Sequence, residues 1–118
     1  MGTGIDCAHP DLAANCWLNP VEVVDGIDND GNGYIDDVTG WDWLHNDNST
    51  YDHIVDSKGG DQNLGETAVM GTIAAVGGNG LGVAGVVWHT KVIALKATTE
   101  HGLVLAANAI AALDYLID

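Results

Sequence analysis

Alternating oxygen-bearing side chains mark one stretch of this chain as a candidate metal-binding loop. Asp28, Asp30 and Asn32 stand at every second position, and Gly33 follows where the chain must turn sharply. This spacing matches the first half of an EF-hand calcium loop. Residues 25–37 carry five carboxylates within thirteen positions, and these repel one another unless a cation lies among them. Ca²⁺ accepts about six to eight oxygen ligands in irregular geometry, so it suits this stretch better than Zn²⁺ or Mg²⁺.

The end of the loop differs from that of an EF-hand. Thr39 occupies the twelfth position, where an EF-hand has a bidentate Glu, and no helical pattern flanks the loop. The pattern therefore predicts a stand-alone calcium loop. The alternative is an acidic turn that water alone solvates.

The charge balance excludes several classes of partner. The chain has 118 residues, a formal net charge of −14 and three cationic side chains, Lys58, Lys91 and Lys96. Nucleic-acid binding needs a basic surface, which this composition lacks, and an anionic membrane would repel the chain. No apolar run reaches the ~18–20 residues that span a bilayer, and no signal-peptide pattern opens the chain. The length allows one domain at most.

Cys7 and Cys16 are nine positions apart. They can form one disulfide if a turn brings them together. Two small buried thiols are the favoured interpretation. No His or Cys partners stand at the spacing of a zinc site.

The hydrophobic pattern predicts an α/β chain in which helix, strand and loop alternate. An acidic, turn-like region covers residues 1–63, and an apolar helix–strand–helix region covers residues 64–118. The expected elements are a helical turn over 8–14, an irregular segment or short strand over 17–24, a strand over 38–44, a long loop over 45–63, a helix over 65–77 that ends at the glycines of 77–80, a buried parallel strand over 91–96 and a second helix over 103–117.

Four segments resemble the subtilisin-like serine proteases, or subtilases. The matching segments, in chain order, are Gly2-Thr-Gly-Ile-Asp6 with His9-Pro-Asp-Leu12, the acidic stretch 28–42, Thr67-Ala-Val-Met-Gly71-Thr72 with the loop 79–86, and the strand and helix over 91–96 and 107–117. They look like the family's Asp-Thr-Gly and His-Pro-Asp-Leu motifs, a calcium loop of one branch, and the His-Gly-Thr-His-Val-Ala-Gly-Thr helix with its following elements. The resemblance implies the N-terminal half of a three-layer subtilase-like fold, truncated to a partial parallel sheet with flanking helices and a long acidic calcium loop.

The resemblance also implies that the catalytic chemistry is missing. The family's Asp orients a His, which takes the proton from the nucleophilic Ser. Gly2 stands at the place of the Asp and Gly65 at the place of the His, and the family's Ser and oxyanion-hole Asn are expected beyond the end of the chain. Glycine accepts no proton, so no peptidase activity is expected. Glu66, one position further, is interpreted as a helix-start residue favoured by the dipole rather than as a substitute base. All five histidines are interpreted as surface or structural residues: His9, His45, His53, His89 and His101.

Two calcium sites follow from the resemblance. The first would use side chains or carbonyls of Asp28, Asp30, Asn32 and Tyr34, with Asp36 or Asp37 closing the loop. The second would pair Asp11 with the Asn79 side chain and with carbonyls near positions 76, 81 and 83.

Three hypotheses for function remain. The first is a non-catalytic subtilase-like pseudoenzyme that binds Ca²⁺ and serves as a structural subunit of a larger complex. The second is a fragment of a subtilisin-like endopeptidase whose nucleophile lies elsewhere, and the third is a simple calcium-binding module. The first is favoured, since a partial parallel sheet and apolar helices need a protein partner to cover them. The subtilase-like, calcium-binding and acidic character favours an extracellular or organelle-lumen location.

Overall fold

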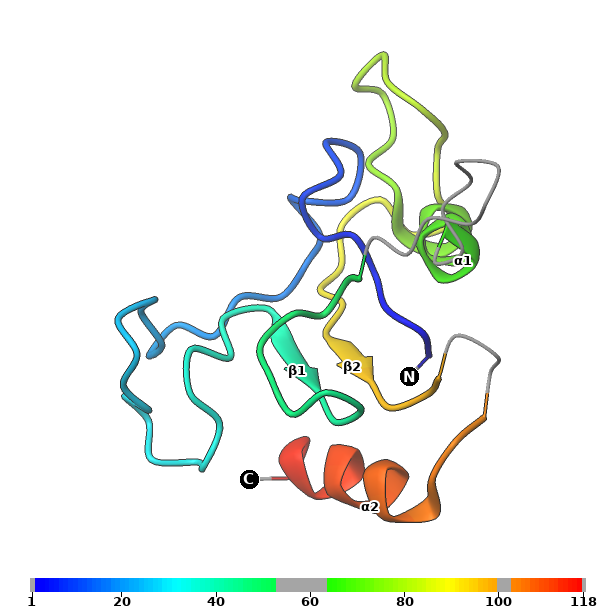
Figure 1. Ribbon diagram of the computed structural model, residues 1–118. Helices are drawn as coiled ribbons and strands as arrows, with labels where there is room; N and C mark the ends of the chain where they lie inside the picture. Colours follow the sequence, from blue (N-terminus) through cyan, green and yellow to red (C-terminus); the bar gives the residue numbers. More distant parts are fainter. Residues whose placement is uncertain (1, 53–63, 100–102, 118) are drawn as a thin grey trace.

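The computed structural model describes residues 2–52, 64–99 and 103–117. Its elements are β1 (Gly40–Asp42), α1 (Leu64–Ala74), β2 (Ala94–Lys96) and α2 (Ala106–Tyr115), in that order along the chain (Figure 1). Between them run long turns and loops, of which the acidic segment before β1 extends away from the two strands (Figure 1). Within the described ranges, no helix is long and apolar enough to cross a membrane.

The two strands form a parallel pair at the centre of the fold. Gly40 pairs with Ala94 and Asp42 with Lys96, and every residue of both strands is buried. Gly40 has a φ of 124°, and a Cβ there would lie 1.9 Å from the Ala94 carbonyl oxygen, so this close strand approach requires glycine. On the other side of β2, Gly2 forms a parallel bridge with Lys96. β2 therefore lies between β1 and the first residues of the chain.

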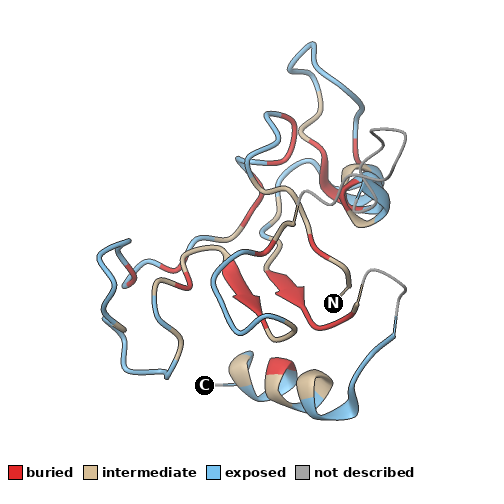
Figure 2. Ribbon diagram, viewed as in Figure 1, coloured by how far each residue is buried: buried red, intermediate tan, exposed pale blue. Residues whose placement is uncertain are grey.

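Each helix packs against a different part of the chain. Met70 and Ala74 of α1 cluster with Leu12 from the turns near the N-terminus. Ala112 of α2 clusters with Leu95 of β2 and with Ala97. The buried residues gather along the two strands and on one side of α1, whereas the acidic segment is largely exposed (Figure 2). In the described part of the chain, the buried apolar residues thus form two small cores rather than one.

The predicted parallel strand and both predicted helices are confirmed, with different bounds. α1 ends at Ala74, before the glycines expected to end it, because residues 86 and 87 donate their amides to the carbonyls of Thr72 and Ile73. α2 begins at Ala106 rather than at residue 103. The reason is that Thr99 donates its amide to the Leu103 carbonyl, which holds the segment before α2 against the chain after β2. Residues 17–24 form no strand, and the expected loop is irregular over 45–52, while 53–63 lie outside the described residues.

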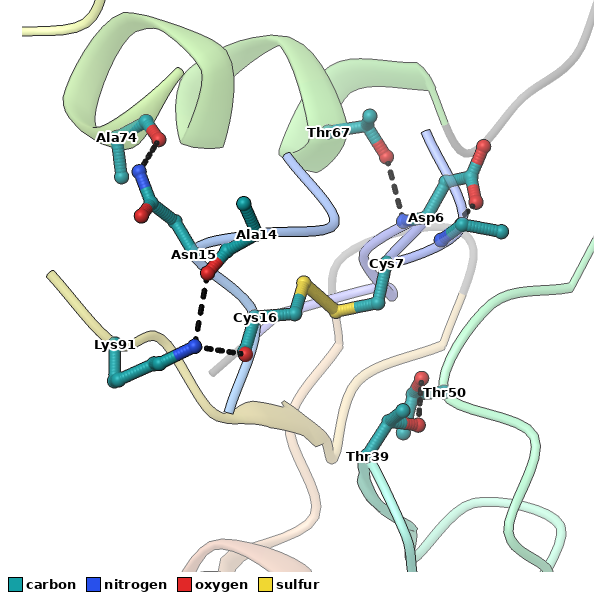
Figure 3. Close-up of a disulfide and its surroundings, with 11 residues drawn as sticks. Asp6, Cys7, Ala14, Asn15, Cys16, Thr39, Thr50, Thr67, Ala74 and Lys91 are labelled. Carbon is teal, nitrogen blue, oxygen red and sulfur yellow. Dashed lines mark hydrogen bonds between the residues drawn. A yellow bond between two sulfur atoms is a disulfide. The ribbon is translucent and has the colours of Figure 1, made fainter. Parts of the chain in front are cut away.

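The interpretation of the cysteines as buried thiols is wrong, because Cys7 and Cys16 form a disulfide (Figure 3). The predicted helical turn explains this. His9 accepts from the amides of Leu12 and Ala13, and Leu12 accepts from the amide of Cys16, which folds the segment back on itself. The two cysteine Cα atoms consequently lie 5.8 Å apart, within the range that a disulfide spans.

Candidate functional site

A buried glutamate organises the acidic loop. Glu22 is 7% exposed. One of its carboxylate oxygens accepts from the amides of Asn29 (2.7 Å) and Asp30 (3.0 Å), and the other accepts from the amide of Asp36 (3.1 Å). Three backbone N–H groups hold this carboxylate in place. Glu22 therefore pins both arms of the loop around one anionic centre.

Asp28 folds the turn at the tip of the loop. Its carboxylate accepts from the amides of Gly31 (2.7 Å), Asn32 (3.1 Å) and Gly33 (2.9 Å). Gly31 and Gly33 have φ angles of 75° and 94°, which glycine adopts without strain. The hydrogen bond from the Gly33 amide, outweighing partial burial, lowers the pKa of the Asp28 carboxyl. The turn thus keeps Asp28 in the charged form that a cation requires.

Three carboxylates converge in this loop. Oxygen atoms of Glu22, Asp28 and Asp30 all lie within 4.8 Å of one another. Asn32 lies beside them and donates its amide nitrogen to Asp30 at 3.1 Å. Such a set contains only hard oxygen donors, and carboxylate oxygens keep lone pairs beyond the amides they accept. The donor set fits Ca²⁺ in its chemistry and is poorly suited to soft metals.

The remaining predicted loop ligands lie in other contacts. Asp36, with a φ of 58°, accepts from the amides of residues 25 and 26 on the far side of the loop. Asp37 is fully buried and accepts from Asn19 (3.0 Å), Asn32 (3.0 Å) and the Tyr115 hydroxyl (2.5 Å). Tyr34 packs edge-on against Trp41, Trp43 and Tyr115. These contacts anchor the loop to β1 and α2.

Glu22 is the residue that sequence reasoning missed. It lies before the alternating pattern, between Val21 and Val23, so it falls outside the EF-hand spacing. Its signal is a charged residue among apolar neighbours just ahead of an acidic loop. This signal is weak, because the two flanking valines are exposed and the glutamate between them is buried, the reverse of what their residue types suggest.

The second predicted site also brings its residues together. Asp11 is 2% exposed, and its carboxylate accepts from the Asn79 side chain (2.7 Å) and the Val83 amide (2.9 Å). The hydrogen bond from Asn79 is the main reason that the pKa of Asp11 is lowered, followed by that from the Val83 amide. The Asp11 carbonyl accepts from the Val76 amide (3.0 Å), and Asn79 accepts from the Leu81 amide (3.1 Å). Asp11, Asn79 and the loop after α1, which the resemblance assigns to one site, therefore lie next to one another.

The disulfide segment ties this second cluster to α1. Asn15 donates to the Ala74 carbonyl at the end of α1 (2.8 Å), and Lys91 donates to the carbonyls of Ala14 (2.8 Å) and Cys16 (3.3 Å) (Figure 3). At the other end of α1, Thr67 accepts from the Asp6 amide at 3.0 Å (Figure 3). Asp11 thus sits on a segment that is bonded to both ends of α1.

The positions that resemble a catalytic pair carry no proton acceptor of their own. Gly2 bridges β2, and Gly65 lies in the first turn of α1. Glu66 follows in the same turn, as expected for an acidic residue at a helix start. Its carboxylate lies against Gly2. The described residues therefore place a carboxylate at this point but no imidazole.

A third cluster joins the two strands. Asp42, His45 and Asp52 bring ligand-type atoms within 4.8 Å of one another. The Lys96 ammonium already lies among them and donates to Asp42 (2.5 Å) and to Asp52. His45 Nδ1 lies 2.7 Å from Asp42, in a structural contact as expected. Because Lys96 supplies the positive charge, this cluster is an ion-pair network. His9 and His89 are exposed, whereas His53 and His101 lie outside the described residues.

Known proteins related to this chain share one description. The chain is 37% identical over 119 aligned residues to subtilisin-like protease 1 of Plasmodium vivax, an alignment that covers 99% of this chain. It is 36% identical to subtilisin-like protease 1 of Plasmodium berghei, in an alignment that covers 100% of this chain. It is 38% identical to subtilisin-like protease 1 of Plasmodium falciparum, in an alignment that covers 99% of this chain. No protein-family model matches the chain.

The chain spans 18%, 18% and 16% of the length of these three relatives, respectively. The similarity extends over the whole chain and agrees with a parallel sheet flanked by helices. The chain is therefore a subtilase-like segment.

Proposed function

We propose that this chain is a non-catalytic, calcium-binding structural subunit or segment of subtilase-like build, held in a larger protein assembly. The observation that carries the proposal is the contrast between its two kinds of site. The catalytic positions hold Gly2 and Gly65, while Glu22, Asp28 and Asp30 converge in the acidic loop. Proteolysis needs the first kind of site, and a structural cation needs the second.

The absence of catalysis is supported by the chemistry of glycine at the two positions. Without an imidazole, no group at position 65 can take the proton from a serine nucleophile. Loss of triad members costs roughly 10⁴–10⁶ in kcat.

Calcium binding is supported by the donor set and its preorganisation. Glu22, Asp28 and Asp30 would hold the ion, with Asn32 as a neighbouring oxygen donor, and Asp11 with Asn79 would form a second site. A bound cation would offset the mutual repulsion of the loop carboxylates. Its role would be to stabilise the fold.

A protein partner is supported by the apolar surface of both helices. Val69 and Ile73 of α1, and Ile110 and Leu113 of α2, are each about half exposed or more. Isolated domains rarely leave so many large apolar side chains of their helices in water. We infer that the partner is the remainder of a subtilase-like polypeptide or another chain that covers these faces. The disulfide supports an oxidising compartment, such as an organelle lumen or the extracellular space.

Calorimetry with Ca²⁺ tests the proposal on the protein as purified, with any copurifying chain retained. Asp30→Ala should weaken binding, because the ion loses one of its ligands and the remaining carboxylates coordinate it incompletely. Asp114→Asn, an exposed change on α2, is the matched control and should leave the affinity unchanged. Equal affinity in the Asp30 variant and the wild type would move the site elsewhere or remove it.

A fluorophosphonate probe and a fluorogenic peptide test the catalytic half of the proposal. Neither labelling nor turnover is expected on this chain. Labelling of this chain would mean that it holds a nucleophile after all. Labelling of a copurifying chain would favour the second candidate function, an endopeptidase fragment whose nucleophile lies elsewhere.

One observation favours the hypothesis of an endopeptidase fragment: this chain covers only a small share of the length of its relatives. A simple calcium module is disfavoured by the exposed apolar helices, which such a module does not need. If the chain is a monodisperse monomer that unfolds cooperatively and binds no hydrophobic dye, the hypothesis of a simple calcium module is favoured instead.

A further inference from the structure

The backbone of Gly2 is fixed by the sheet. Its amide donates to the Leu95 carbonyl (3.2 Å), and its carbonyl accepts from the Ala97 amide (3.3 Å). Both polar groups of this residue therefore face β2. The direction in which a side chain at position 2 would leave the strand is set by these two bonds.

The Glu66 carboxylate fills the space at the start of that direction. A Cβ added to Gly2 would lie 2.5 Å from the Glu66 carboxyl carbon and 2.6 Å and 2.8 Å from its two oxygens. Real Cβ atoms do not approach other atoms so closely. The carboxylate of residue 66 and a side chain at residue 2 are thus alternatives for one volume.

The first turn of α1 is held where it can deliver this carboxylate. Thr67, the next residue, is buried and accepts from the amide of Asp6 at 3.0 Å. Met70, one turn further, is buried against Leu12. These contacts fix α1 relative to the N-terminal segment on the side from which Glu66 reaches Gly2.

The described residues leave the space over Gly65 open. Among them, a Cβ added there would meet nothing within 4 Å apart from its chain neighbours and the nearby backbone of α1 itself. A side chain at position 65 can therefore be introduced without displacing another part of the described structure. The Glu66 carboxylate thus lies against Gly2, and the described residues leave room for a side chain at the preceding position, Gly65.

We propose that Glu66 is the positioning residue of this degenerate centre and supplies, from α1, the carboxylate that the subtilase motif carries at the place of Gly2. This carboxylate comes from α1 rather than from residue 2, and it lies where the Cβ of a side chain at position 2 would stand. The chain has therefore lost the base of the catalytic pair but has retained a group that can orient and stabilise an imidazolium. This goes beyond the proposed structural role and does not depend on calcium or on a partner.

The test introduces an imidazole at the open position. In Gly65→His, the pKa of the new imidazole, followed by NMR with labelled histidine, should be raised by about one unit or more relative to an exposed histidine, because an anion close to it favours its charged form. Gly65→His/Glu66→Gln keeps the size of residue 66 and removes its charge, so the pKa should return toward its ordinary value. Free histidine in the same buffer serves as the reference.

Equal imidazole pKa values with and without the Glu66 charge would overturn the proposal. A second measurement covers the case in which the position-65 variants do not fold. Gly2→Asp should raise the pKa of the new carboxyl in the presence of Glu66, since two carboxylates cannot both ionise easily in one volume. The same carboxyl should titrate ordinarily in Gly2→Asp/Glu66→Gln. If the pKa of the carboxyl at position 2 is the same with Glu66 and with Gln at position 66, Glu66 does not occupy this position. This outcome is independent of the calorimetry with Ca²⁺.

Discussion

The Lys96 ammonium lies 2.5 Å from Asp42 Oδ2, so a buried ion pair joins the ends of β2 and β1. Asp42 is fully buried and Lys96 is 2% exposed. Asp52 adds a second carboxylate, and His45 Nδ1 lies 3.3 Å from the ammonium. Two residues that are far apart in sequence thus close the carboxyl ends of the parallel pair through one charge network.

Removal of the lysine charge should destabilise the fold strongly. Lys96→Met leaves Asp42 buried without its cation, which we expect to cost about 3–5 kcal/mol in the free energy of unfolding. Urea denaturation of the variant measures this loss. Lys91→Met, an exposed lysine, is the control and should cost much less. Similar losses for both lysines would mean that the buried pair contributes no more than a surface contact.

Acid should unfold the metal-free protein through three carboxyls. Burial alone would raise the pKa of Asp42, but the hydrogen bonds from Lys96 and His45 outweigh it and lower the pKa. Hydrogen bonds from Asn79 and from the Gly33 amide lower the pKa values of Asp11 and Asp28, respectively. Groups with a depressed pKa stabilise the folded state above their ordinary pKa of about 3.9, and this stability disappears as pH falls through their lowered values.

The measurement is the melting temperature between pH 7 and pH 2 in a chelating buffer. We expect a plateau above about pH 5 and a steep fall below pH 4. Asp11→Asn removes one of the contributing groups and should flatten part of that fall. A melting temperature that keeps rising as the pH is lowered would contradict the depressed pKa values.

Calcium affinity should depend on Glu22 as well as on the residues of the alternating pattern. Glu22→Gln removes one charge from the converging carboxylates and keeps the volume of the side chain, so Ca²⁺ should bind at least several-fold more weakly. Glu66→Gln has the same chemistry far from the loop and should bind Ca²⁺ as the wild type does. Calorimetry that ranks the two variants equally would remove Glu22 from the site.

Reduction of the disulfide should loosen the N-terminal turns. Cys7→Ser/Cys16→Ser removes the cross-link that closes this short loop, which should cost about 2–3 kcal/mol in the free energy of unfolding. Hydrogen exchange should accelerate at the amides of Leu12 and Cys16, which the turn holds. Protection at these amides that is unchanged in the double variant would show that the turns stand without the bridge.

The framework of the fold could be predicted from sequence because its signals are local. An apolar run bounded by lysines predicts a buried parallel strand, and β2 lies inside it. Small and apolar residues over one stretch predict α1. The element ends could not be predicted, because distant backbone groups set them. Val86 and Val87 follow a long loop after α1. Their amides donate hydrogen bonds to carbonyls near the C-terminus of α1, and these bonds end the helix.

The candidate site was predicted where its spacing is regular. Asp28, Asp30 and Asn32 follow a two-residue period that can be read without a structure. Glu22 could not be found in this way, because its burial depends on amides seven to fourteen residues further along the chain. The Glu66 contact with Gly2 depends on how α1 is placed against the sheet.

The pairing of β1 with β2 has a consequence for the order of folding. Asp42 and Lys96 are 54 positions apart, so the chain must close a long loop before a single strand–strand bond forms. Such closure is slow, because the entropy of the intervening chain is lost before the contacts compensate for it. The turns around the disulfide and α1 involve local contacts and are expected to form early. The parallel sheet, with its buried charge pair, would then be the last part of the molecule to assemble.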